Sequence, residues 1–149
     1  MGYYLEAIIG NQQTLAQCAS AFQHARVVPL AQEIAIIPIT DDLFNEIPRS
    51  GLVERFEKLS TGVEKWAQHI SKVAPVAYIE AEFFGGSGGQ SAVMWSGGSR
   101  KFGPFHSEDA INQILRLFKV QLDGAHDEFD AVGLGRHRRT NRWIVDSAP

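Results

Sequence analysis

The stretch VAYIEAEFFGGSGGQSAVMW, residues 76–95, combines an alternating segment, a glycine-rich centre and a second apolar run. In an extended chain, successive side chains point to opposite faces, so residues 76–84 would present one apolar face and one polar face. The apolar face comprises Ala77, Ile79, Ala81 and Phe83, and the other comprises Tyr78, Glu80 and Glu82. The run Ser91–Trp95 and the segment Lys101–Phe105 follow after short glycine-containing turns. This order predicts an antiparallel meander of three strands whose polar face is exposed to water.

The centre of this stretch also satisfies the G-x-S-x-G pattern of a hydrolase nucleophile elbow, with Ser87 as the serine. An elbow requires a helix directly after the serine. Here a short run follows that stops at Gly97 and Gly98, which indicates a strand instead. We therefore interpret residues 85–90 as a hairpin loop, predict no catalytic residue, and keep Ser87 as a candidate contact with a partner.

The flanking segments alternate between strand and helix patterns. Tyr3–Ile9 is a predicted strand, and Asn11 a predicted cap for a helix. Two short β-branched runs follow, and then two helical patterns. The runs are Val27–Leu30 and Ile34–Ile39; the helical patterns are Leu52–Ile70, with a bend near Gly62, and a helix capped by Ser107 that extends to Leu122. A further short strand is predicted at Trp143–Val145.

These elements predict an α+β fold: a two-layer sandwich in which helices pack on one face of a mostly antiparallel sheet. Parallel strands would need helical crossovers, for which residues 76–105 leave no room. The length of 149 residues suits a single globular domain spanning residues 1–149.

The charge and cysteine content exclude several classes of protein. The net charge is −3, and removing the four positive charges of Arg136, Arg138, Arg139 and Arg142 leaves −7 for the rest of the chain. An acidic body with one basic segment fits a protein partner better than a nucleic acid. The single Cys18 cannot form an internal disulfide, and no segment has the length of a membrane span. We expect a soluble, cytoplasmic protein without a membrane partner.

Glu80 and Glu82 are the first candidate site. Two residues apart on one strand, they lie about 7 Å apart along the backbone. Carboxylates at that separation can act as acid and base in glycoside hydrolysis or share a divalent cation. The same alternation also occurs on any solvent-facing strand, and no third ligand or metal motif accompanies the pair. No metal or cofactor is predicted.

The C-terminal segment HDEFDAVGLGRHRRTNRW, residues 126–143, is the second candidate site. Its basic and aromatic residues could bind phosphates or bases, contact another protein, or pair with the acidic body of the same chain. These residues are Arg136, His137, Arg138, Arg139, Arg142 and Trp143. We favour pairing within the chain, then a protein interface, and consider nucleic acid the least supported reading.

The segments AYIEAEFFGGSGGQSAVMW and DEFDAVGLGRHRRTNRW together resemble a family of small uncharacterised bacterial proteins that share a glycine-rich loop after an acidic strand and a GLGRHR-like motif. The resemblance implies no catalytic residue. In size the chain is similar to bacterial immunity proteins, which neutralise toxins. We therefore expect a non-enzymatic protein-binding module of the inhibitor or immunity type. The alternative is a small hydrolase or divalent-ion enzyme that uses Glu80 and Glu82. A homodimer would be compatible with either function.

Overall fold

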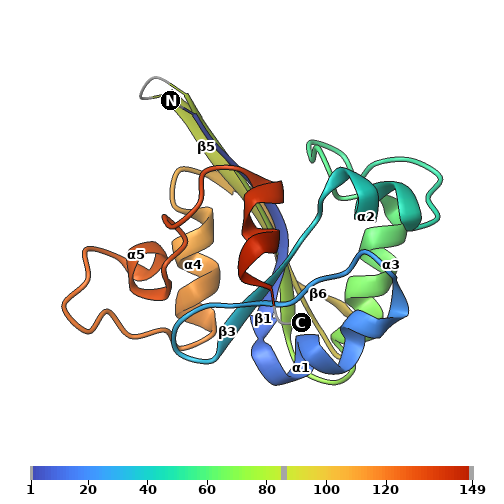
Figure 1. Cartoon of the computed structure of the whole chain (residues 1–149), viewed down its shortest axis with the longest axis horizontal. Coiled ribbons are helices and arrows are strands. Elements are labelled where there is room, and N and C mark those ends of the chain that lie inside the picture. The colour runs from blue at the N-terminus through green and yellow to red at the C-terminus, as the bar shows by residue number, and fades with distance from the viewer. Residues whose placement is uncertain (1, 85–86, 148–149) are drawn as a thin grey trace.

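A six-stranded antiparallel sheet forms the centre of the protein, as the computed structural model shows (Figure 1). The structure describes residues 2–84 and 87–147, with Ser87 described through its backbone alone. The strand order is β2-β3-β1-β4-β5-β6. The strands are β1 (Tyr3–Asn11), β2 (Val28–Pro29), β3 (Ile34–Pro38), β4 (Val76–Phe84), β5 (Ser87–Ser96) and β6 (Ser99–Ser107). The predicted antiparallel α+β fold is confirmed.

Helices cover both faces of this sheet, so the prediction that they pack on one face alone is wrong. One face packs against the helices α4 (Ala110–Leu117) and α5 (Glu128–Val132) and the 3-10 helix η2 (Thr140–Asp146). The opposite face packs against α1 (Gln12–Cys18), α2 (Asp41–Glu46) and α3 (Thr61–Ile70), and the 3-10 turn η1 (Ala19–Ala21) follows α1. Figure 1 shows the two groups on either side of the strands. Residues of β1, β3, β4 and β5 alternate between the two cores, which is why both faces need a cover.

The predicted meander is present as β4, β5 and β6. Phe84 pairs with Ser87 at one end, and Ser96 pairs with Ser99 at the other. Ala77, Ile79 and Ala81, predicted to form the apolar face of this strand, pack in the core beneath α4, and Phe83 is partly buried against that core. Gly85 and Gly86, at the centre of the predicted loop, lie outside the described residues. Gly88 and Gly89 belong to strand β5 rather than to the loop.

Three predicted helix or strand assignments differ from the structure. The helix predicted from Leu52 begins only at Thr61, because the Ser60 hydroxyl accepts a hydrogen bond from Val63 N–H and caps α3. Gly62 does not bend this helix; a Cβ there would lie 1.8 Å from the Pro48 carbonyl oxygen, so a side chain has no room.

The other two differences lie in the second half of the chain. Ser107 is the last residue of β6, and its hydroxyl donates to Asp109 instead of capping α4. The helix itself spans Ala110–Leu117 and so ends before the predicted Leu122. The strand predicted at Trp143–Val145 is part of the 3-10 helix η2. Trp143 is fully buried there, in the core beneath α4 and α5.

Candidate functional site

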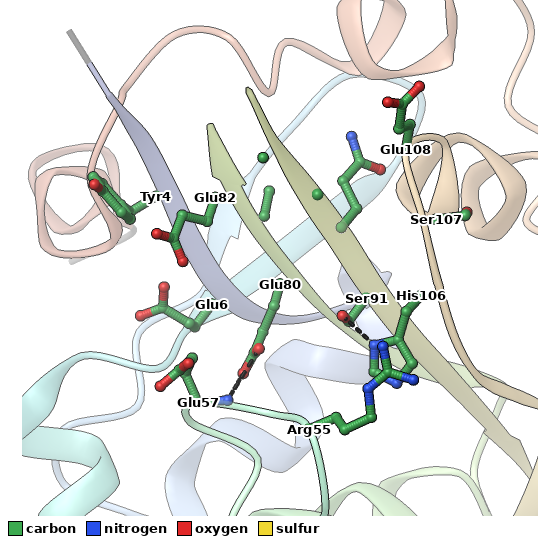
Figure 2. A pocket seen from close by; sticks show the side chains of 14 residues that line it. Tyr4, Glu6, Arg55, Glu57, Glu80, Glu82, Ser91, His106, Ser107 and Glu108 are labelled. Carbon is green, nitrogen blue, oxygen red and sulfur yellow. Dashed lines mark hydrogen bonds between the residues drawn. The ribbon is translucent and has the colours of Figure 1, made fainter. Parts of the chain in front are cut away.

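The face of the sheet that packs against α2 and α3 is covered over only part of its length. Tyr78 and Val93 lie beneath the helices, whereas residues nearer the β4–β5 turn line an open pocket of about 870 Å³. Four strands contribute to its floor, and the loop between α2 and α3 forms one wall (Figure 2). The polar residues that line it are Tyr4, Glu6, Arg55, Glu57, Glu80, Glu82, Gln90, Ser91, His106, Ser107 and Glu108. The pocket therefore forms where the helical cover ends.

Glu80 anchors the loop that forms this wall. Its carboxylate accepts hydrogen bonds from Glu57 N–H at 2.8 and 3.0 Å, from Lys58 N–H at 2.8 Å and from the Tyr78 hydroxyl at 2.7 Å. The side chain is buried, and desolvation raises the pKa of Glu80 above its ordinary value. The prediction of a water-facing Glu80 and Tyr78 is thus wrong, because the folded-over loop covers both residues. Glu82, by contrast, is exposed as predicted.

Glu6 is a site residue that the sequence analysis did not single out. It pairs with Glu80 across strands β1 and β4, and the Thr140 hydroxyl donates to its carboxylate at 3.2 Å. Burial, followed by the neighbouring charge of Glu80, raises the pKa of Glu6 to about 7. The sequence feature that could have identified Glu6 is its charge within the apolar run Tyr3–Ile9. A carboxylate on a buried strand needs a polar partner or belongs to a functional site.

A second pocket adjoins the first and shares Tyr4 and Glu6 with it. Asp41 and Asp42, at the start of α2, line this second pocket. We call the two pockets together the acidic groove, defined by the carboxylates of Glu6, Asp41, Asp42, Glu57, Glu80, Glu82 and Glu108. Lys58 pairs with Asp41. Within residues 2–84 and 87–147, Asp42, Glu57, Glu82 and Glu108 form no ion pair.

Ser91 and His106 form a second unexpected feature of the pocket. They face each other across β5 and β6, and Ser91 Oγ lies 2.5 Å from His106 Nδ1 (Figure 2). The ring of Phe56 packs against the imidazole with a centroid separation of 5.4 Å. Desolvation and the positive charge of Arg55 lower the pKa of His106. The imidazole is therefore neutral at neutral pH.

The register of the β5–β6 hairpin explains why the pairing of Ser91 with His106 could not be predicted from the sequence. Ser96 pairs with Ser99 and Trp95 with Arg100, and continuing that register would place residue 104 opposite Ser91. The register shifts between Ala92 and Trp95 bring His106 opposite Ser91 instead. An irregularity of this kind depends on the local backbone and is not readable from alternation alone.

Most of the predicted C-terminal site residues contact their own chain. Arg136 and His137 both bind the carboxylate of Asp146, at 2.9 and 2.7 Å. Arg139 donates to the Gly2 carbonyl oxygen at 2.9 Å and lies 4.6 Å from the Tyr4 ring centroid. Trp143 is fully buried and cannot stack on a ligand.

All four arginines of this segment are exposed, and Arg139 also lines the second pocket. Arg138 and Arg142 differ from Arg136 and Arg139 because, among the described residues, their side chains form no hydrogen bond or ion pair. They are the members of the basic segment that remain available to a partner. Ser87, the third predicted location, begins strand β5, and its side chain lies outside the described residues. Ser87 is followed by strand β5 up to Ser96 and not by the helix that a nucleophile elbow requires.

Comparison with family models, with curated proteins and with solved structures gave no match. Among residues 2–84 and 87–147, no group of three or more His, Cys, Asp or Glu side chains is arranged to hold a metal ion. No helix in the same described ranges is long and apolar enough to cross a membrane. The resemblance to small bacterial proteins stays a prediction.

Proposed function

We propose that the protein is a binding module of the inhibitor or immunity type, and that its acidic groove receives a basic segment of another protein. The observation that carries this proposal is the set of groove carboxylates without an ion pair among the described residues: Asp42, Glu57, Glu82 and Glu108. Carboxylates gathered along one groove focus a negative potential that attracts lysine and arginine side chains.

The shape of the groove supports an elongated ligand. Two pockets share Tyr4 and Glu6, so one extended segment could place basic side chains in both. A cation beside Glu6 would also favour the charged form of its carboxyl group, whose pKa of about 7 reflects burial near Glu80. Part of the desolvation cost of Glu6 would then be offset by the partner.

Other functions have less support. An enzyme that uses Glu80 and Glu82 as its acid and base would need both carboxylates, but Glu80 already accepts hydrogen bonds from two backbone amides and from Tyr78. Nucleic acid would be repelled by the groove, and the basic segment largely contacts its own chain. The single Cys18 supports a cytoplasmic location as part of the proposal. A homodimer remains compatible with it.

The test is affinity capture from lysate of the source cells with three forms of the protein: wild type, Glu82→Lys and Asp130→Lys. Glu82 lines the groove, whereas Asp130 is exposed in α5 on the opposite side of the sheet. Both variants change the charge by the same amount. We expect wild type and Asp130→Lys to retain one protein in stoichiometric amount, and Glu82→Lys to lose it.

Salt dependence completes this test. Interactions between exposed charges weaken as the Debye length falls from about 10 Å at 0.1 M salt to about 3 Å at 1 M. We expect the affinity of the captured protein to fall across that range. Equal retention by all three forms, or capture of no protein, would contradict the proposed function, provided that circular dichroism shows each variant to be folded.

A further inference from the structure

We propose that Ser91 is a nucleophilic serine that His106 activates, and that it reacts with acyl esters entering the pocket. The Ser91 Oγ to His106 Nδ1 distance of 2.5 Å meets the geometric requirement for a nucleophile and its general base. Both residues line the open pocket, and both are only partly buried. This assignment does not depend on the acidic groove having a protein partner.

Several neighbours hold the imidazole in its required state. His106 lies on β6 directly opposite Ser91, and the Phe56 ring packs against it at a centroid separation of 5.4 Å. Burial and the charge of Arg55 keep the imidazole neutral, so Nδ1 can accept a proton when Nε2 carries the other. Among the described residues no carboxylate hydrogen-bonds to Nε2, so the pair is a serine–histidine dyad, with Phe56 packed against the imidazole ring.

The reaction follows from these positions. Ser91 Oγ attacks the carbonyl carbon of the ester and forms a C–O bond, while the hydroxyl proton moves to His106 Nδ1. The tetrahedral intermediate then breaks its bond to the leaving alcohol, which takes the proton from His106. His106 then deprotonates a water molecule, whose oxygen attacks the acyl carbon. The bond from that carbon to Ser91 Oγ breaks, the carboxylic acid leaves, and His106 returns the proton to Ser91 Oγ.

The charges around the pocket select the class of ester. Glu6, Glu82 and Glu108 line the same pocket and disfavour anionic substrates. Arg55 is the only lysine or arginine among the described residues that line this pocket, and its charge acts on His106. It is the group suited to stabilise the negative charge that develops on the carbonyl oxygen. The substrate class is therefore a neutral or cationic acyl ester.

An uncharged alkyl fluorophosphonate tests this assignment, because it phosphonylates activated serines with loss of fluoride. We expect intact-mass measurement of the full chain to show one adduct, which peptide mapping places on Ser91. Ser91→Ala should abolish the adduct. His106→Gln, which keeps a hydrogen-bonding side chain but cannot act as the base, should slow labelling about 100-fold. Ser99→Ala, an exposed serine at the opposite end of the same hairpin, should label at the wild-type rate.

The pH profile gives a second readout. Because the neutral imidazole is the active form, the labelling rate should rise with pH and reach its plateau below the pH expected for an ordinary histidine, whose pKa is about 6.5. Absence of an adduct on Ser91, or unchanged labelling of His106→Gln, would overturn the assignment. Hydrolysis of p-nitrophenyl acetate by wild type but not by folded Ser91→Ala would extend it to turnover.

Discussion

The two faces of the sheet differ in how far their apolar pattern extends. On the face covered by α4, α5 and η2, strand β1 contributes Tyr3, Leu5, Ala7 and Ile9, all buried. On the opposite face only Ile8 of the same strand belongs to the core, while Tyr4 and Glu6 line the acidic groove. The closed face of β1 is apolar from Tyr3 to Ile9, and the open face changes from apolar to polar where its helices end.

This difference shows how one set of strands serves both structure and a site. Because alternate side chains point to opposite faces, the closed face stabilises the backbone of β1 and β4 beneath the groove. The open face can then hold carboxylates whose burial is unfavourable, such as Glu6 and Glu80. A site of this kind reduces stability locally while the closed face compensates for the loss.

The largest expected effect comes from breaking the anchor of the open face. Glu80→Ala should lower the free energy of unfolding by about 4 kcal/mol, because it leaves the buried Tyr78 hydroxyl and the Glu57 and Lys58 amides without their acceptor. Urea denaturation at pH 7 measures this change. The matched control, Glu82→Ala, should change stability by less than about 0.5 kcal/mol, because Glu82 is exposed. Similar losses in the two variants would show that the loop is held by other contacts.

An effect of intermediate size is expected at Glu6, because a charged carboxylate buried in the groove lowers the free energy of unfolding. The pKa of Glu6 is raised from 4.5 to about 7, so its ionisation opposes folding as pH rises through this interval. Glu6→Gln should therefore stabilise the protein by about 2 kcal/mol at pH 8, after allowing for partial solvent access. Below pH 4.5, where the carboxyl is protonated in both states, the gain should vanish. A gain that does not vary with pH would contradict this account of Glu6.

The smallest effect is expected for a polar anchor of the closed face. Asn112 on α4 accepts a hydrogen bond from Phe129 N–H at 2.8 Å and donates to Asp127 at 3.2 Å, which joins α4 to α5. Asn112→Ala should cost about 1 kcal/mol, because these groups are only partly buried and can bind water instead. Thermal unfolding measures the loss. A loss as large as that of Glu80→Ala would mean that both faces depend equally on buried polar anchors.

Alternation and helical spacing predicted the antiparallel sheet and most of its strands. The same reasoning failed at residues 52–60, where Leu59 and Phe56 have a helical spacing but belong to the loop that folds over Tyr78 and Glu80. It also failed at Trp143, which is buried in a 3-10 helix rather than in a strand. In both cases the apolar pattern correctly predicted that Phe56, Leu59 and Trp143 are buried, but it predicted the wrong backbone conformation.

The candidate site was less predictable than the fold. Glu82 was recognised as an exposed carboxylate, and Glu80 was assigned to the same wet face because the loop that covers it is distant in sequence. Glu6, Ser91 and His106 were not recognised. Their site requires the pairing of β1 with β4 and the shifted register between β5 and β6.

By itself, the sequence determined the antiparallel α+β character of the protein, the apolar face of β4 and the acidity of the body, because these follow from local alternation and charge. Only the tertiary structure decided that helices cover both faces and that one cover ends early. It also decided which carboxylates meet in a groove and which serine faces a histidine. Such contacts join residues distant in the chain, and they depend on strand register and loop placement rather than on local pattern.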